Sequence, residues 1–185
     1  SLYAKTFWPQ WFDHGLYGEI YREAGLIESK VKGVFESVAA SYRLYMLYQV
    51  WSSLNIRSTL DYGCNRASHS IHLHNRFGGE FTGVDIDAVS LAGARDFVDR
   101  YAKDKNAFDF LVGDENFKPD KSYDAVIMLD VLEHVIDAVT LLNKAQEWVK
   151  KDGWIIVTVP HGPVEYDMWV DSPQRNREHV REFGL

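Results

Sequence analysis

The chain carries the stretch STLDYGCNRA at residues 58–67, a short apolar run that leads into a turn. Ser58–Tyr62 contains several residues that favour a strand, and Gly63 follows it directly. A glycine at this point lets the backbone turn sharply and approach a ligand closely. The stretch therefore predicts a strand over Ser58–Tyr62, a ligand-contacting turn at Gly63 and a helix over Ala67–Phe77.

The chain repeats this order of strand and helix further along. More strands are predicted at Glu80–Ile86, Phe108–Val112, Asp124–Leu129 and Trp154–Val159. Helices are predicted over Ala88–Lys103, with Asp87 as the N-cap, and from about Ala138 to a stop at Gly153. Alternating strands and helices favour an α/β fold, in which a parallel sheet is covered by helices on both faces.

The first part of the chain, residues 1–55, is predicted to be an aromatic-rich helical segment, and residues 56–185 the main domain. A helix to about Leu54 is expected from the helical spacing of Phe35, Val38, Ala39, Tyr42 and Met46. Earlier aromatic residues either pack on the main domain or form a lid over a substrate pocket. They are Tyr3, Phe7, Trp8, Trp11, Phe12, Tyr17 and Tyr21.

Composition narrows the class of protein. The 185 residues carry a formal net charge of −7, which disfavours nonspecific binding to nucleic acid or to anionic membranes. The only cysteine, Cys64, excludes an internal disulfide and fits a reducing compartment. No apolar run approaches the roughly 20 residues of a membrane helix. We therefore expect a soluble, cytoplasmic protein.

Acidic residues follow several of the predicted strands. Asp85 comes about twenty residues after the first turn, where a carboxylate can accept hydrogen bonds from both hydroxyls of a ribose. Asp114 and Asp130 follow the next two strands. Because parallel strands end at one rim of the sheet, these positions together predict a nucleoside pocket.

As a set, these segments resemble the class I S-adenosylmethionine-dependent methyltransferases over roughly residues 56 to 183. LDYGC at 60–64 is similar to the first motif of that family, and GVDID at 83–87 to the second. YDAVI at 123–127 with LEHV at 132–135 resembles the fourth-strand motif, and KDGWIIVTVP at 151–160 the fifth.

The resemblance implies a Rossmann-like three-layer sandwich that binds S-adenosyl-L-methionine and releases S-adenosyl-L-homocysteine. In this family Gly63 would pass under the methionine part, Asp85 would hold the ribose and Asp114 would meet the adenine amine. Asp61 would order the first loop rather than touch the ligand. The implied cofactor-binding residues are Tyr62, Gly63, Cys64, Asn65, Asp85, Ile86, Asp114, Glu115, Leu129 and Asp130.

Two positions depart from the family pattern, because Asn65 and Ala67 stand where glycine is usual. Asn tolerates a positive φ, so Asn65 can keep the turn, whereas Ala67 adds a methyl group at a close approach. The departures either weaken cofactor binding or mark a degenerate domain that serves as a binding or structural module. The Gly-x-Gly-x-x-Gly spacing of a dinucleotide site is absent, which argues against a nicotinamide enzyme.

His134, with Glu133 beside it, is the candidate base for a hydroxyl acceptor. Its structural alternative is a residue that caps or packs the following helix. His179 lies in REHVREF at 177–183, which resembles the segment after the fifth strand in methyltransferases that act on small molecules and sugars. There the histidine often faces the substrate pocket; the alternative is a surface helix. Arg175, Arg177 and Arg181 either form a solvated face or contact an anionic acceptor group.

The remaining chemistry-bearing residues are given structural roles. We expect His69, His72 and His74 to lie on a solvated helix surface and to bind no metal, because no Asp or Cys joins them at ligand spacing. Cys64 is expected to pack in its loop, since no local base supports a nucleophile.

The family fold has seven strands, of which this sequence predicts five, so the core is expected to lack its C-terminal hairpin. The N-terminal segment, a partner chain in a homodimer or a further domain would then cover the sheet edge. The favoured function is methyl transfer from S-adenosylmethionine to a small molecule, with a sugar or glycan precursor and an oxygen atom favoured as acceptor. The alternative is the degenerate module.

Overall fold

The computed structural model of the chain describes residues 34–159. The chain divides into two compact units, residues 1–53 and 54–185. The described part of the first unit is one helix, and the described part of the second is a sheet with its helices. No helix among the described residues is long and apolar enough to cross a membrane.

The helix of the first unit, α3, spans Val34–Ser53 and confirms the predicted helix. Its buried positions differ from the predicted apolar face, because Tyr42 and Met46 are only half-buried. The helix is apolar on more than one side, so spacing alone did not identify the most buried positions. The buried residues are Leu44, Tyr45, Leu47, Tyr48 and Trp51.

The second unit contains one sheet of five strands in the order β3-β2-β1-β4-β5. Every pair of neighbours is parallel, which confirms the predicted α/β class. The order reverses between β1 and β4, and ligands of such sheets bind at this switch point. The strands are β1 Ser58–Tyr62, β2 Glu80–Asp85, β3 Phe108–Val112, β4 Tyr123–Leu129 and β5 Val149–Thr158.

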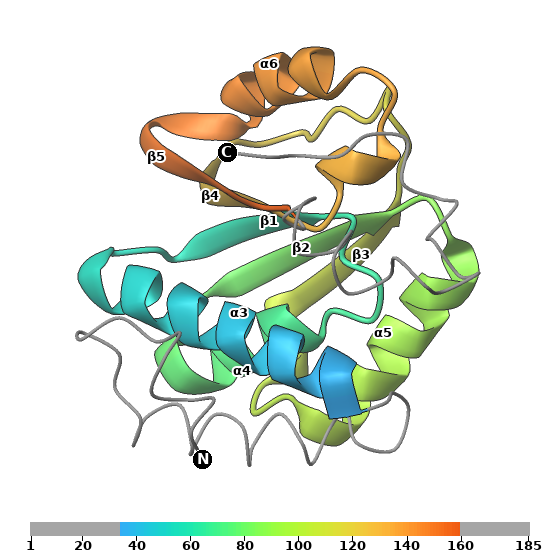
Figure 1. The fold of residues 1–185 in the computed structure, drawn as a ribbon. Helices are drawn as coiled ribbons and strands as arrows, with labels where there is room; N and C mark the ends of the chain where they lie inside the picture. The colour runs from blue at the N-terminus through green and yellow to red at the C-terminus, as the bar shows by residue number, and fades with distance from the viewer. Residues whose placement is uncertain (1–33, 160–185) are drawn as a thin grey trace, which may run out of the picture. The chain divides into compact units, whose positions relative to one another are not determined.

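Helices cover both faces of this sheet, with α6 on one face and α4 and α5 on the other (Figure 1). Asp87 caps α5 as predicted, because its carboxylate accepts the backbone N–H groups of Val89 and Ser90 at 3.0 Å each. The helices are α4 Ser68–Phe77, α5 Ala88–Tyr101 and α6 Ala138–Trp148, with short 3₁₀ turns η1 Lys105–Ala107 and η2 Leu132–His134.

Each face of the sheet has its own hydrophobic core. The α6 side is built around Leu60, Val126, Met128, Leu141 and Trp148. The α4 and α5 side is built around Ile71, Leu91, Ala94, Val98 and Phe110. Two separate cores on one parallel sheet are the packing that a doubly wound α/β domain requires.

The region after α6 corrects the sequence prediction, because the helix ends at Trp148 rather than near Gly153. Val149 is extended and already pairs with Tyr123, whereas the regular register resumes at Trp154. The intervening residues bulge out of β5. A Cβ atom at Gly153 would lie 2.7 Å from the carbonyl oxygen of Asp124, so glycine serves this close approach and not a helix stop.

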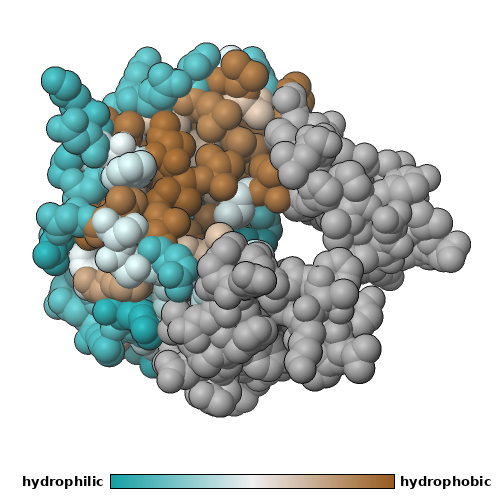
Figure 2. Space-filling model, turned by 60° about the vertical axis from the view of Figure 1, so that its left-hand side comes forward, coloured by the Kyte–Doolittle hydropathy of each residue, from teal (hydrophilic) through white to brown (hydrophobic). Residues whose placement is uncertain are grey.

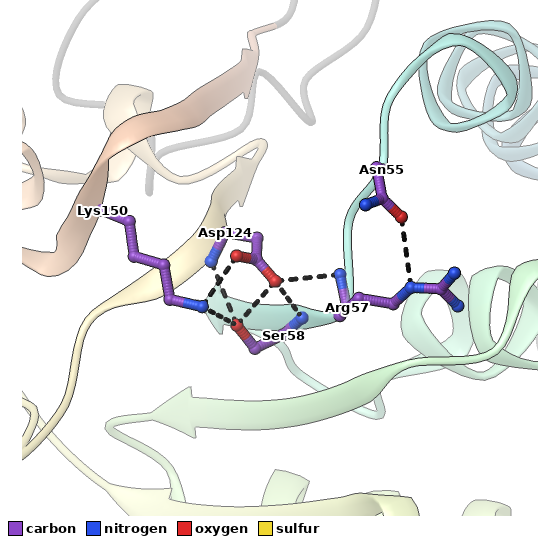
Figure 3. Close-up of polar contacts among 5 residues, drawn as sticks. All are labelled: Asn55, Arg57, Ser58, Asp124 and Lys150. Atoms are coloured by element: carbon purple, nitrogen blue, oxygen red, sulfur yellow. Dashed lines mark hydrogen bonds and ion pairs between the residues drawn. The ribbon is translucent and has the colours of Figure 1, made fainter.

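Asp124 ties three strands together at their amino ends (Figure 3). Its Oδ2 accepts the backbone N–H groups of Arg57 and Ser58 at 3.0 and 2.8 Å, and its Oδ1 accepts Lys150 Nζ at 2.7 Å. Partial burial raises the pKa of this carboxyl, but the hydrogen bonds from Lys150, Arg57 and Ser58 outweigh it and lower the pKa to about 2. The carboxylate thus holds the starts of β1, β4 and β5 together.

The histidines of α4 contradict the predicted solvated surface. His72 and His74 are both buried, and burial lowers the pKa of His72 to about 4. His74 places Nδ1 2.8 Å from the carbonyl oxygen of Gly79, and its ring contacts that of Phe108 with centroids 5.0 Å apart. Within residues 34–159 no group of three His, Cys, Asp or Glu side chains could hold a metal ion.

Strand β5 lies at one end of the sheet and, among the described residues, pairs with β4 alone. Its apolar residues Ile155, Ile156 and Val157 are half-buried. Apolar residues also gather in a continuous area on the face shown in Figure 2, with hydrophilic residues along its left and upper margins. Cover for this edge by another segment or chain stays a prediction.

Candidate functional site

The turn after β1 and the tip of β2 are joined by backbone hydrogen bonds. The N–H groups of Gly63 and Cys64 donate to the carbonyl oxygen of Val84 at 2.7 and 3.0 Å. The N–H of Asn65 donates to Asp85 Oδ2 at 2.8 Å, and the N–H of Asp87 donates to Asp85 Oδ1 at 2.9 Å. The structure therefore brings the predicted glycine turn and the predicted ribose carboxylate together.

Three residues of this turn have left-handed backbone conformations. The φ angles are 76° at Gly63, 48° at Asn65 and 56° at Ala67. Asn65 keeps the turn, as the sequence predicted. Ala67 is buried and held in the left-handed region, which costs an alanine about 1 kcal/mol relative to an ordinary conformation. The departure from the family glycine is therefore tolerated at a cost in stability.

The turn after β3 reaches the same rim. The N–H of Gly113 donates to the carbonyl oxygen of Asp85 at 3.0 Å. The Tyr62 hydroxyl donates to the carbonyl oxygen of Asp114 at 2.8 Å, and the Tyr62 ring is buried. Asp114 and Glu115 are both exposed. Among the predicted cofactor residues, Tyr62 thus differs from the others because its hydroxyl holds a neighbouring loop.

The end of β4 completes the rim on the other side of β1. Leu129 and Asp130 are half-buried, and Asp130 has a φ of 55°. The N–H of Asp130 donates to the carbonyl oxygen of Thr158 at 3.0 Å, and the Thr158 hydroxyl donates to Asp130 Oδ1 at 3.0 Å. These bonds hold Asp130 in its left-handed conformation against the end of β5.

The predicted catalytic residues lie on η2, directly after this rim. Glu133 is buried with 1% exposure, whereas His134 is partly exposed. His134 Nε2 lies 4.0 Å from Glu133 Oε1. The imidazole of His134 is thus accessible directly after the end of β4. His179, the third predicted catalytic residue, lies outside the described residues.

Two buried side chains, those of Asp61 and Cys64, belong to β1 and to the turn that follows it. Asp61 accepts a 2.6 Å hydrogen bond from the Ser70 hydroxyl, which joins β1 to α4. Burial raises the pKa of Asp61 to about 7, with Ser70 lowering it and Asp85 raising it by smaller amounts. Cys64 is buried too, and burial raises the pKa of its thiol. The predicted structural roles of Asp61 and Cys64 agree with this geometry, because a buried neutral thiol is a poor nucleophile.

The contribution of some residues was missed by sequence reasoning. Thr158 fixes Asp130 and Ser70 fixes Asp61, although neither stands out in the sequence. The only signal for Thr158 was its position at the end of the fifth predicted strand. A strand-end position locates a residue at the rim but does not give its hydrogen-bond partner.

The rim fits an adenosyl group in its chemistry. Asp85 and Asp114 offer carboxylates held by backbone N–H groups. Two aliphatic side chains beside them face solvent, since Ile86 is 71% exposed and Val112, the neighbour of Asp85 in the sheet, is 64% exposed. Fixed acceptors next to accessible apolar surface match a ribose and an aromatic base.

The strand order and this rim define a Rossmann-like domain of the class I methyltransferase type. The chain belongs to the family described as "Methyltransferase domain", whose model matches residues 33–184. The family model therefore covers the sheet, the turns at its carboxyl edge and most of the following residues.

Curated relatives include both nitrogen and oxygen methyltransferases. The chain is 24% identical over 149 residues to a ubiquinone biosynthesis O-methyltransferase of Rhodopseudomonas palustris (strain HaA2), covering 68% of this chain and 57% of that protein. It is 23% identical over 123 residues to (S)-coclaurine N-methyltransferase of Thalictrum flavum subsp. glaucum, covering 60% of this chain and 33% of that protein. The chain thus spans between a third and just over half of these relatives.

Solved structures show the same fold. The YcgJ protein of Bacillus subtilis matches with a TM-score of 0.61 and 20% identity, covering 76% of this chain and 63% of that one. Coclaurine N-methyltransferase bound to N-methylheliamine and S-adenosylhomocysteine matches with a TM-score of 0.58 and 19% identity, covering 69% and 37%. At these identities the likeness concerns the fold.

Proposed function

We propose that this domain binds S-adenosylmethionine and supports transfer of its methyl group to a small-molecule acceptor. The observation that carries the proposal is the convergence of Gly63, Asp85 and Asp114 at the carboxyl edge of the sheet. Membership of the methyltransferase domain family supports the same reading. So does the S-adenosylhomocysteine present in solved proteins of this fold.

The residues of the rim then take separate parts of the cofactor. Asp85 would accept the two ribose hydroxyls through the lone pairs that Asn65 and Asp87 do not use. Ile86 would lie against the adenine, and Asp114 would accept its amine. The other predicted contacts are Gly63, Cys64 and Asn65 under the methionine part, Glu115 beside the adenine, and Leu129 and Asp130 near the sulfur. Tyr62, which the sequence also predicted as a contact, would instead act through its hydrogen bond to the Asp114 carbonyl oxygen.

When bound, the cofactor supplies a methyl group on a positively charged sulfur, and transfer joins that carbon to the acceptor atom as the carbon–sulfur bond breaks. The protein contributes by aligning acceptor, methyl and sulfur. A hydroxyl acceptor must also lose its proton, and His134 is the proposed base for that proton. Buried Glu133, 4.0 Å away, would stabilise the imidazolium that results.

The identity of the acceptor is proposed from the sequence alone. A sugar or glycan precursor methylated at oxygen follows from the segment around His179, which lies outside the described residues. The named relatives transfer methyl groups to nitrogen in one case and to oxygen in another. Both hydroxyl and amine acceptors therefore belong in the test.

A second candidate is a methyltransferase-like domain that binds the cofactor without turnover and serves as a module of a larger assembly. The observation that favours it is Ala67, which is buried with a φ of 56° where the family usually has glycine. Strain in this turn would weaken binding of the methionine part of the cofactor.

The experiment that separates the two candidates is release of S-adenosylhomocysteine from S-adenosylmethionine in the presence of panels of hydroxyl and amine acceptors. The enzyme predicts acceptor-dependent release. Substituting His134→Gln is expected to lower kcat by about 100-fold, with KM for the cofactor unchanged. Asn143→Ala, on the exposed side of α6, is the matched control and should keep full activity. Binding of S-adenosylhomocysteine without release for any acceptor would favour the module.

A further inference from the structure

The turn after β3, residues 113–117, is closed by its own backbone. The carbonyl oxygen of Asp114 accepts the N–H of Phe117 at 2.9 Å, and Asp114 Oδ1 accepts the N–H of Asn116 at 2.8 Å. Asp114 Oδ2 accepts no hydrogen bond from the described residues. One oxygen of this carboxylate therefore shapes the turn, and the other is available at the rim.

A first tether reaches the turn from β1. The Tyr62 hydroxyl donates to the same Asp114 carbonyl oxygen at 2.8 Å, so two donors share this acceptor. The Tyr62 ring is fixed by its neighbours, with its centroid 5.3 Å from that of Trp148 and 6.4 Å from that of Phe117. Because the ring is buried and packed on two sides, the position of its hydroxyl is fixed.

A second tether reaches the turn from α6. Lys144 Nζ donates to the carbonyl oxygen of Glu115, the residue after Asp114. Lys144 is half-buried as a residue, and its bond to Glu115 lies at the protein surface. Side chains from two different elements thus fix consecutive carbonyl groups of one turn.

We infer that Tyr62 and Lys144 are positioning residues that orient the Asp114 carboxylate for recognition of the adenine amine. The inference deepens the proposed function and rests on it. Neither residue touches the cofactor in this account, because each acts through a backbone carbonyl of the turn. A rotation of the turn would move Asp114 Oδ2 away from the amine while the ribose contact at Asp85 remains.

The protonation state of Tyr62 agrees with a permanent tether. Burial raises the pKa of the hydroxyl to about 12, with smaller contributions from Asp114, Glu115 and Asp85. The hydroxyl therefore stays a donor over the whole range in which the protein would be assayed.

The test compares two ligands that differ at the amine. S-adenosylhomocysteine carries it, whereas S-inosylhomocysteine carries an oxygen in its place, and calorimetry gives the dissociation constant of each. The intact domain is expected to prefer the adenosyl ligand. Tyr62→Phe keeps the ring and removes only the hydroxyl, so it should weaken adenosyl binding about 5-fold and reduce the preference by a similar factor. Tyr101→Phe, a partly exposed tyrosine at the end of α5, should change neither value.

The second tether gives a second variant. Lys144→Met keeps the aliphatic chain and removes the donor, and it should reduce the preference in the same direction as Tyr62→Phe. Lys144→Arg restores a donor and should recover most of it. Amide hydrogen exchange offers a readout without ligand, since the N–H groups of Asn116 and Phe117 should exchange faster in Tyr62→Phe than in Tyr101→Phe.

Each outcome decides the inference. A reduced preference with faster exchange in residues 113–117 supports it. An unchanged preference in Tyr62→Phe and Lys144→Met overturns it while the proposed function stands. Equal loss of affinity for both ligands also overturns it, because general loosening would not single out the amine. If the unaltered domain binds neither ligand, the proposed function fails and the inference fails with it.

Discussion

The backbone N–H of Asn65 donates a hydrogen bond of 2.8 Å to Oδ2 of Asp85, and this bond joins the turn after β1 to the tip of β2. Asn65 itself has a φ of 48°, in the left-handed region. The carboxylate is therefore oriented by the protein before any ligand arrives. Preorganised acceptors of this kind cost no reordering when a ligand binds.

Gly63 is the tightest point of the same turn. A Cβ atom there would lie 2.5 Å from Val131 Cγ2, and its φ is 76°. Gly63→Ala is expected to lower the free energy of unfolding by about 3 kcal/mol, from strain and overpacking together, as measured by urea denaturation. Gly78→Ala is a control without a steric clash, because Gly78 also has a positive φ, of 75°, and no atom lies within 4 Å of the added Cβ.

The two parts of this effect can be separated. Gly78→Ala reports backbone strain without a clash. Because Gly78 has a ψ of −157°, in a region restricted almost entirely to glycine, we expect a cost of about 2 kcal/mol. Adding Val131→Ala to Gly63→Ala should recover the steric part, beyond the loss that Val131→Ala causes by itself. No recovery of stability when Val131→Ala is added to Gly63→Ala would show that Val131 does not limit the turn.

The raised pKa of Asp61 predicts that the free energy of unfolding falls as pH rises. Its pKa is raised from 3.8 to about 7 in the folded protein, so folding favours the protonated form. The contribution of Asp61 to the free energy of unfolding is fully present below about pH 4 and is lost progressively as pH rises up to and beyond 7. Asp61→Asn mimics the protonated form. Its free energy of unfolding, relative to that of the unaltered domain, should rise by about 2 kcal/mol between pH 5 and pH 8. A constant difference across this range, as expected for the exposed control Asp109→Asn, would contradict the assignment.

The lowered pKa of Asp124 predicts the opposite pH dependence of the free energy of unfolding. Its pKa is lowered from 3.8 to about 2, so the folded protein favours the ionised form. The contribution is full above about pH 4 and is lost as pH falls toward 2. Thermal unfolding should show that Asp124→Asn costs about 1 kcal/mol at pH 6, because solvent screens this partly exposed pair, and that the cost fades at low pH. The exposed Asp120→Asn serves as the control, and a cost independent of pH would refute the Lys150 contact as its source.

The strands could be predicted from the sequence because their signals are local. Ser58–Tyr62 and Phe108–Val112 match the structure residue for residue, since apolar runs bounded by Gly or polar residues mark short buried strands. The Asp87 cap was predictable for the same reason, because its partners lie two and three residues away. The carboxyl edge then followed from the rule for parallel sheets.

The end of α6 could not be predicted in this way. The helix stops at Trp148 because Val149 pairs with Tyr123, which is 26 residues earlier in the chain. Nothing in the local sequence announces that pairing, and Gly153 looks like a helix stop although it serves the bulge of β5. Tertiary pairing outweighed local propensity at this position.

The polar interior was also beyond sequence reasoning. His72 and His74 were expected on a solvated helix surface because no metal ligand joins them in the sequence, yet both are buried. The bond from Tyr62 to the Asp114 carbonyl joins residues 52 apart, and a carbonyl acceptor has no signature in the sequence. Residue types predicted which carboxylates reach the rim, but not how the protein holds them there.

The central claim, that Asp85 helps to hold an adenosyl ligand at this rim, is tested most directly by calorimetric titration of S-adenosylhomocysteine. The account predicts a dissociation constant in the micromolar range for the unaltered domain, and loss of measurable binding in Asp85→Ala. Asp109→Ala, on the neighbouring strand β3, should bind like the unaltered domain. Undiminished binding in Asp85→Ala, or no binding by the unaltered domain, would contradict the account.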